Sequence, residues 1–213
     1  MARRQVGHLT DSRLGEAAEA LSQAFHEDPL QSYTFPDPEE RRRLSPLHFA
    51  AILRYGQLAG HVLAGAEPGS GAIVGIPPDA VGTPEMAETS GLTRLGEAIG
   101  ADAAARFSRA VDYAETQHRR LMQEPHWYVM VLGVAPAFQG QGYGRALLQP
   151  MFDIADNDGV PCYLETTQPK NVTFYERLGF HVLTTGVEPE SGLHVWTFRR
   201  DPARWVPELT IDG

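Results

Sequence analysis

The chain has 213 residues and a formal net charge of −9 at pH 7, with 27 acidic against 18 basic side chains. This length suffices for one domain with a core of its own, so we expect a single domain over residues 1–213. The negative charge speaks against a protein that binds nucleic acid. The eight histidines form no ligand-spaced cluster with cysteine or carboxylates, so we expect no metal site.

The one cysteine, Cys162, lies in an apolar run. A single cysteine excludes a disulfide within the chain and indicates a reducing compartment. The first residues lack the apolar stretch of a signal peptide, and no segment approaches about 18 uninterrupted apolar residues. We therefore expect a cytoplasmic protein that neither spans nor binds a membrane.

The first 76 residues predict short strands and two helices. The expected elements are a strand over 6–9, a helix over about 11–25, a helix over about 38–56 and a hairpin of strands 61–66 and 72–76. Thr10 or Asp11 can cap the first helix, and the Asp28-Pro29 pair ends it. A turn with two glycines, over 67–71, joins the hairpin strands.

The next segment, residues 83–124, predicts helices over 91–99 and 101–122, which Gly100 separates. An apolar, strand-like run over 126–134 follows. After a glycine-rich stretch, a helical run extends to about residue 156.

The glycine-rich stretch reads Gln139-Gly140-Gln141-Gly142-Tyr143-Gly144-Arg145. Glycine permits positive φ angles and a close approach of the backbone to a ligand. Exposed N–H groups at a helix N-terminus, together with the positive end of the helix dipole, suit a phosphate or pyrophosphate. The spacing fits neither a P-loop nor the G-x-G-x-x-G dinucleotide motif, because no Lys-Ser or Lys-Thr follows and the last glycine is absent.

A second block, over residues 161–180, reads Pro-Cys-Tyr-Leu-Glu-Thr-Thr-Gln-Pro-Lys-Asn-Val-Thr-Phe-Tyr-Glu-Arg-Leu-Gly-Phe. Together with the Q-x-x-G-x-G motif at 139–144, it resembles the GNAT superfamily of acyl-CoA-dependent N-acetyltransferases. In that family the first motif binds pyrophosphate, and the second spans the fifth strand and a short helix with Asn and a Phe-Tyr pair. The chain looks most similar to the puromycin N-acetyltransferase type.

The resemblance implies an α/β GNAT fold, with a mixed, splayed sheet of about seven strands and helices on both faces. The helices over 83–124 would form an insertion between the third and fourth strands, over the acceptor side of the cleft. A bulge at Gly133 would help to splay the fourth and fifth strands, although glycine in a strand can also mark close packing. The implied reaction is direct transfer of the acetyl group of acetyl-CoA to a primary amine of a small molecule.

The resemblance also implies an acetyl-CoA site. The expected contacts are Leu132, Val134, Gln139, Gly140, Gln141, Gly142, Tyr143, Gly144, Arg145, Asn171 and Phe174. The glycine loop would hold the pyrophosphate, and the backbone of Leu132 and Val134 would face pantetheine and the acetyl group, with an N–H near Val134 as oxyanion donor. Asn171 is expected to contact the pantetheine arm, to cap a short helix over 172–178, or both.

The catalytic groups are less closely defined. The resemblance makes Tyr175 the general acid, since its phenol is protonated at neutral pH and can point into the cleft rather than the core. As general base we expect Glu165, because a carboxylate in an apolar strand is costly unless it is paired or functional. An ion pair or a backbone hydrogen bond is the alternative role for Glu165. His126 is the second candidate for the base, Glu27 and Asp28 could hold a cationic acceptor, and a water chain can replace a single base.

Two other functions agree with the same motifs, namely a non-catalytic acyl-CoA-binding or sensing module and an N-acyltransferase that uses a longer acyl group. The presence of Asn171, Tyr175 and the complete glycine loop favours an active enzyme. The sequence leaves the acceptor amine open. It also leaves the oligomeric state open, although a homodimer through C-terminal strands would be usual in this family.

Overall fold

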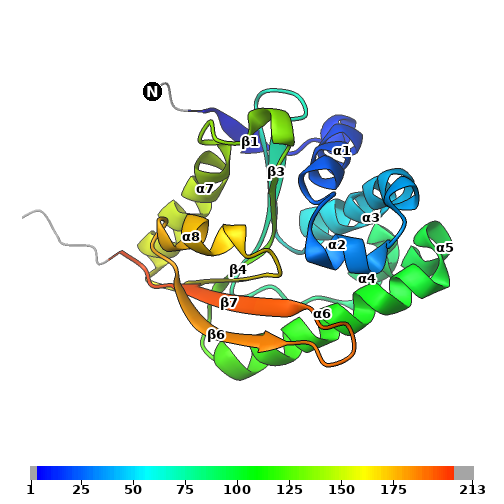
Figure 1. Ribbon diagram of the computed structural model, residues 1–213. Coiled ribbons are helices and arrows are strands. Elements are labelled where there is room, and N and C mark those ends of the chain that lie inside the picture. The colour runs from blue at the N-terminus through cyan, green and yellow to red at the C-terminus, as the bar shows by residue number, and fades with distance from the viewer. Residues whose placement is uncertain (1–3, 204–213) are drawn as a thin grey trace, which may run out of the picture.

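The computed structural model describes residues 4–203, which form a seven-stranded sheet flanked by helices (Figure 1). The strands are β1 (Val6–His8), β2 (His61–Gly65), β3 (Gly71–Ile76), β4 (Trp127–Val134), β5 (Cys162–Thr166), β6 (His181–Val187) and β7 (His194–Arg200). Their order across the sheet is β1-β2-β3-β4-β5-β7-β6. Neighbouring strands are antiparallel except for β4 and β5, which are parallel, so the sheet is mixed as predicted.

Eight α-helices connect the strands within the described residues. They are α1 (Leu14–Ala24), α2 (Pro29–Thr34), α3 (Pro38–Ala59), α4 (Pro84–Ser90), α5 (Leu95–Ile99), α6 (Ala101–Leu121), α7 (Tyr143–Asp158) and α8 (Lys170–Glu176). Short 3-10 turns are η1 (Asp11–Arg13), η2 (Leu92–Arg94) and η3 (Pro136–Phe138). The sequence pattern predicted the long helices to within a few residues, but it did not predict α2 or α4.

Capping explains these two short helices. Asp28 caps α2 by accepting a hydrogen bond from the N–H of Leu30 (2.9 Å), and Thr83 caps α4 through the N–H of Met86 (3.2 Å). A proline stands at the start of each helix. Backbone N–H groups in the first turn of a helix have no intrahelical acceptor, so proline, which lacks this N–H, costs no hydrogen bond there. Its fixed φ also suits the helix.

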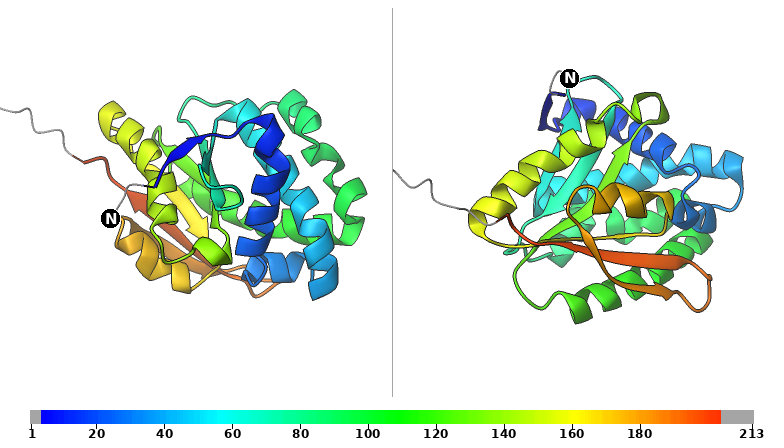
Figure 2. Two further views of the ribbon diagram at one scale, coloured as in Figure 1. Left: turned by 90° about the horizontal axis from the view of Figure 1, so that it is seen from above. Right: turned by 60° about the vertical axis from the view of Figure 1, so that its left-hand side comes forward.

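Helices cover both faces of the sheet, and β3 supplies side chains to both. Ile73 lies in a core with residues of α7, whereas its neighbours Ala72 and Val74 lie in a second core with α1 and α3. This division follows from the alternation of side chains along a strand. Figure 2 shows α7 on one side of the sheet and α1 with α3 on the other.

The parallel strands β4 and β5 diverge soon after they meet. They pair at two positions, Trp127 with Cys162 and Tyr128 with Tyr163. On its other edge β4 carries one extra residue, Met130, between two residues that pair with consecutive residues of β3. This is a β-bulge, which bends the strand. The sheet is therefore splayed, as predicted.

The prediction of the bulge at Gly133 was wrong. Gly133 pairs with Ala72 in regular register. A Cβ atom on Gly133 would lie 2.6 Å from Leu21 and 2.8 Å from Phe25, so glycine is needed here for α1 to pack directly on β4. Gly133 therefore has the alternative role, which is to permit close packing.

The helices expected over 83–124 lie between β3 and β4 in the sequence, and α6 is the longest of them. Gly100, with φ of 90°, separates α5 from α6. In space α6 packs against α2, α5 and β7, and Figure 1 shows it running past β6 and β7. Within residues 4–203, no helix combines the length and apolar character needed to cross a lipid bilayer.

Candidate active site

The glycine-rich loop leads the chain into α7. Gly140 and Gly142 have φ angles of 72° and 87°, in the left-handed region that glycine readily adopts. Gly142 is the N-cap residue of α7. A Cβ atom on either glycine would have no neighbour within 4 Å, so backbone conformation rather than packing calls for glycine.

The backbone N–H groups of residues 140–145 have no protein acceptor in the described part of the chain. The first hydrogen bond at this end of α7 runs from the N–H of Ala146 to the carbonyl of Gly142 (3.1 Å). Free N–H groups at the positive end of a helix dipole form an anion-binding site. The loop therefore has the geometry of the phosphate site that its sequence predicts.

Arg4 lies over this loop and was not singled out in the sequence. Its guanidinium donates to the backbone carbonyl of Gln141 (3.4 Å) and to the Oε1 of the same residue (3.3 Å). Its Cζ lies 4.8 Å from the centre of the Tyr143 ring. That ring is buried against Phe138, so Tyr143 offers the loop its N–H and not its side chain. Arg4 adds positive charge, but a contact across 137 residues leaves no local signal in the sequence.

The backbone of β4 is open on the edge that faces β5. The N–H of Ala135 donates to the carbonyl of Ser70 on the β3 side (3.0 Å). Because successive residues of a strand direct their backbone groups to opposite edges, Leu132 and Val134 face the gap toward β5. The carbonyl of Val134 accepts a hydrogen bond from the Nε2 of Gln139 (3.0 Å).

Helix α8 closes one side of this gap. Asn171 lies inside α8, whose N-cap is Pro169, so the prediction that Asn171 caps the helix was wrong. Its side-chain amide instead donates to the Oγ1 of Thr166 at the end of β5 (3.2 Å). Phe174 packs against the first turn of α7, where a Cβ on Gly144 would lie 3.0 Å from the Phe174 ring. The two sequence motifs therefore meet in space.

Tyr175 is more buried than expected, with 6% of its surface exposed. Its ring packs near Phe180 and Phe198, with ring centres 5.7 and 5.5 Å away, and it also lines the cavity described below. Tyr175 thus belongs to the core as well as to the cleft. Burial, and then the Asp28 carboxylate, raise the pKa of Tyr175 well above its usual value, so the phenol is protonated at neutral pH.

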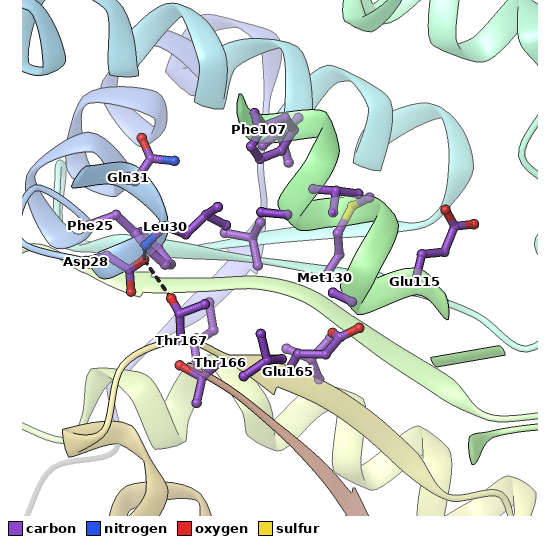
Figure 3. Close-up of a pocket in the computed structure, with 18 of the residues that line it drawn as sticks. Phe25, Asp28, Leu30, Gln31, Phe107, Glu115, Met130, Glu165, Thr166 and Thr167 are labelled. Atoms are coloured by element: carbon purple, nitrogen blue, oxygen red, sulfur yellow. Dashed lines mark hydrogen bonds between the residues drawn. The ribbon is translucent and has the colours of Figure 1, made fainter. Parts of the chain in front are cut away.

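A cavity of about 600 Å³ extends from the gap between β4 and β5 toward helices α2, α3 and α6 (Figure 3). Leu132, Glu165, Asn171 and Tyr175, all singled out in the sequence, line it. Figure 3 shows Glu165 on the wall formed by β5, and Phe107 of α6 across the cavity from it.

Glu165 extends from β5 into this cavity. Burial raises the pKa of its carboxyl group to about 8, and the phenols of Tyr128 and Tyr163 offset part of that increase. Glu165 forms no ion pair with a basic side chain of residues 4–203, so an ion pair does not explain its place in the strand. A group whose pKa lies near the working pH suits a general base.

Glu27 and its neighbour Asp28 have different surroundings. The side chain of Glu27 is 81% exposed, lies 3.6 Å from His26 and is not part of the cavity wall formed by the described residues. Asp28 does line the cavity, and it accepts hydrogen bonds from the N–H of Leu30 and from Thr167 (3.1 Å). The geometry therefore favours Asp28 over Glu27 as a neighbour of the acceptor.

His126 lies beside a second, outer pocket of about 270 Å³. Its Nε2 is 2.6 Å from the Nε2 of His118, and its Nδ1 is 2.7 Å from the carbonyl of Glu124. Glu115, His118 and Tyr128 line both pockets and form the wall between them. Burial, and then the neighbouring His126, lower the pKa of His118 to about 4, so this wall carries no positive charge from His118 at neutral pH.

The structure also brings Glu115, His118 and Tyr128 to the acceptor side, where the helices over 83–124 were expected but none of these three residues was singled out. Two of the three come from α6, and only the packing of α6 against the sheet places them there. Among residues 4–203, no group of three or more His, Cys, Asp or Glu side chains could hold a metal ion.

Comparisons with known proteins agree with this site. The model of the Acetyltransferase (GNAT) family matches residues 16–180. Two curated relatives match locally. The uncharacterized N-acetyltransferase C550.08 of Schizosaccharomyces pombe is 44% identical over 54 residues, which is 25% of this chain and 22% of the relative. The mycothiol acetyltransferase of Propionibacterium freudenreichii is 40% identical over 67 residues, which is 30% of this chain and 21% of the relative. The matches thus span less than a quarter of each relative.

Solved structures share the fold over nearly the whole chain. A histone acetyltransferase HPA2 and related acetyltransferase from Corynebacterium glutamicum aligns with a TM-score of 0.69 at 23% identity, covering 96% of this chain and 99% of that one. Arylalkylamine N-acetyltransferase 2 from Aedes aegypti aligns with a TM-score of 0.61 at 12% identity, covering 95% of this chain and 100% of that one. At such identities the alignments show the fold alone, and they confirm the predicted GNAT fold. Because the family model matches more than half of this chain, the chain belongs to the GNAT acetyltransferase family.

Proposed function

We propose that this protein transfers the acetyl group of acetyl-CoA directly to a primary amine of a small molecule. One observation carries the proposal. The free N–H groups of residues 140–145 begin α7, which packs on one face of the sheet, and the cavity with Glu165 and Tyr175 extends from the gap between β4 and β5 toward α3 on the other face. A donor with an anionic head and a long arm would be held at the loop while its reactive end reaches the cavity.

The donor would be held mainly by main-chain groups. The N–H groups of Gln141, Gly142, Gly144 and Arg145 would bind the pyrophosphate, with Arg4 beside them. The exposed backbone edge at Leu132 and Val134 would bind the pantetheine arm by strand-like hydrogen bonds. The side chain of Arg145 is exposed at the start of α7, where it can approach a phosphate.

The reaction would need three proton transfers. The ionised form of Glu165, the minor form below its pKa of about 8, takes a proton from the ammonium group, directly or through water, and the freed lone pair forms the C–N bond at the thioester carbonyl. The N–H near Val134 donates to the carbonyl oxygen as negative charge develops on it. The C–S bond then breaks, and Tyr175 gives its proton to the departing thiolate. The second proton that the nitrogen must lose on becoming an amide returns to Tyr175, directly or through water, and restores its phenol.

Direct transfer, rather than an acetylated enzyme, is supported by the state of Cys162. This side chain is fully buried, and burial raises the pKa of its thiol to about 12. The thiolate is the nucleophilic form of cysteine, so Cys162 is poorly suited to take up the acetyl group.

The test is release of CoA thiol from acetyl-CoA in the presence of a panel of primary amines, with mass spectrometry of the product. We expect Tyr175→Phe to lower kcat by about 10²-fold or more, the range of a general acid, without changing the Kd for CoA. Tyr33→Phe, which removes a hydroxyl that bonds to Arg109 outside the cavity, serves as the matched control.

The other outcomes identify the alternatives. CoA binding without thiol release for any amine would contradict the proposal and favour an acyl-CoA-binding or sensing module. Turnover with longer thioesters alone would favour an N-acyltransferase of a different acyl group. The puromycin-type relationship, the cytoplasmic location, the homodimer and the single-domain organisation all remain predictions.

A further inference from the structure

The part of the cavity wall toward α3 and α6 is apolar. It is formed by Phe49 and Ile52 of α3, Leu92 of η2, Phe107 and Ala110 of α6, and Met130 of β4. Leu92, Phe107 and Met130 pack against the same apolar core that includes Phe49 and Ile52. We refer to these six residues as the apolar chamber. Figure 3 shows Phe107 and Met130 on the side of the cavity away from Thr166 and Thr167.

The charged side chains that line the cavity are all acidic. No lysine or arginine of the described chain lines the cavity. Three of its four carboxylates are held by protein donors: Asp28 by Leu30 and Thr167, Glu188 by the N–H groups of residues 190 and 191, and Glu115 by Arg119 (2.8 Å). Glu115 stands at the wall shared with the outer pocket. Glu165 remains as the carboxylate best placed to meet an ammonium group.

The chamber itself carries no ionised group at neutral pH. His48 is fully buried beside it, stacked on Phe49 and in edge contact with Phe107. Its Nδ1 is 3.3 Å from the Nε2 of Gln31. Burial lowers the pKa of His48 to about 4, so the ring is neutral and offers no positive charge to a carboxylate.

We propose that the acceptor is a primary monoamine with an apolar alkyl or aryl body, whose ammonium group meets Glu165 and whose body fills the apolar chamber. The inference rests on the proposed function and narrows it to one substrate class. It excludes acceptors with a second charge at the far end. A carboxylate there would be desolvated in a cavity that already carries negative charge, and a second ammonium would be desolvated without a partner.

Three amines of equal length test this proposal. Hexylamine, 1,6-diaminohexane and 6-aminohexanoate differ only in the group that would reach the chamber. We expect kcat/KM to be highest for hexylamine, roughly tenfold lower for the diamine and about a hundredfold lower for the amino acid, in line with the cost of burying unpaired charge. Among unbranched alkylamines, kcat/KM should rise by about fourfold for each added methylene until the chamber is full.

A variant with a smaller apolar chamber provides a second, independent part of the test. Ala110 is buried and lines the cavity, so Ala110→Leu should remove room for the hexyl chain while leaving room for propylamine. We expect this variant to lose about tenfold in kcat/KM for hexylamine and less than twofold for propylamine. Ala105→Leu, at an exposed position of the same helix, is the matched control and should change neither value.

Equal or faster turnover of the diamine or the amino acid would overturn the inference and leave the proposed function intact. If no amine is acetylated, the proposed function fails. Calorimetric titration of the three amines into the CoA-bound protein then still decides the inference. Preferential binding of hexylamine, lost in Ala110→Leu, supports the chamber, whereas equal binding of all three contradicts it.

Discussion

At the scale of single residues, Glu165 links function to stability. Its pKa is raised to about 8 by burial, so the folded protein keeps a proton that the unfolded chain releases above about pH 4.5. The unfolded state therefore binds fewer protons between these pH values, and stability falls as pH rises from about 4.5 to 8. Glu165→Gln has no such proton to lose. Because one pKa unit corresponds to about 1.4 kcal/mol, we expect it to be more stable than the wild type by several kcal/mol at pH 9 and equally stable at pH 4.

Urea unfolding at pH 4, 6.5 and 9 measures this difference. Glu27→Gln is the matched control, because the Glu27 side chain is 81% exposed and should show the wild-type pH dependence. A Glu165→Gln variant that follows the wild type at every pH would mean that Glu165 is ionised in the folded protein at neutral pH. Its role as a base with a raised pKa would then be wrong.

Site residues that belong to a contiguous sequence motif could be predicted, whereas those brought to the site from distant parts of the chain could not. Glu165 and Tyr175 could be predicted because each belongs to a contiguous motif. Arg4, Glu115 and His118 could not, because α6 and the start of the chain reach the site only through tertiary packing. The sequence pointed to Glu27 and Asp28 together, and the turn into α2 brings Asp28 to the cavity while Glu27 stays exposed.

At the scale of elements, the two ends of α7 permit a controlled test of the glycine loop. Gly142 at its start and Gly159 at its end have φ of 87° and 68°, and a Cβ on either would meet nothing within 4 Å. Alanine at either position should therefore cost about 1–2 kcal/mol of stability through backbone strain. Only Gly142→Ala should also weaken CoA binding, by about tenfold, because it distorts the free N–H groups.

Isothermal titration with CoA and urea unfolding of both variants measure the two effects separately. Equal loss of CoA affinity in Gly142→Ala and Gly159→Ala would show that general destabilisation, not loop geometry, controls binding. Unchanged affinity in both would remove the loop from the binding site.

The contact between α1 and β4 depends on one glycine. A Cβ on Gly133 would press into Leu21 and Phe25, so Gly133→Ala should overpack this contact and cost about 1–3 kcal/mol in unfolding free energy. Gly7→Ala in β1, where a Cβ would have open space, should have little effect. Thermal unfolding of both variants tests this expectation, and equal stability of the two would contradict the packing.

Elements differed in how well the sequence predicted them. The strands and long helices followed from alternating or helical apolar patterns, which tertiary packing preserves. The helices α2 and α4, of six and seven residues, are too short for such a pattern, and only an Asp-Pro or Thr-Pro pair marks their starts. The bulge lies at Met130 because of the register between β3 and β4, which no single residue type encodes.

At the scale of the whole molecule, the sheet consists of two parts that meet weakly at the site. One part contains β1 to β4 and the other β5 to β7, and β4 and β5 pair at two positions before they diverge. Elsewhere the parts are joined by the core around α7 and by Arg200 of β7, which binds Asp156 of α7 through two hydrogen bonds of 2.7 and 2.8 Å. A ligand in the gap could form hydrogen bonds with both strands where β4 and β5 no longer pair with each other.

This arrangement predicts that CoA stabilises the whole fold by bridging the two parts. At a CoA concentration of 100 times Kd, mass action gives about 2.7 kcal/mol, and for a chain of this size the Tm should rise by roughly 5–10 °C. Amide hydrogen exchange should slow at Leu132 and Val134 of β4 and at the end of β5, on both sides of the gap. Pantetheine, which lacks the pyrophosphate, should give a much smaller rise in Tm at the same concentration. A full rise in Tm with slowed exchange at the glycine loop alone would contradict bridging, because the ligand would then bind one part of the sheet without crossing to the other.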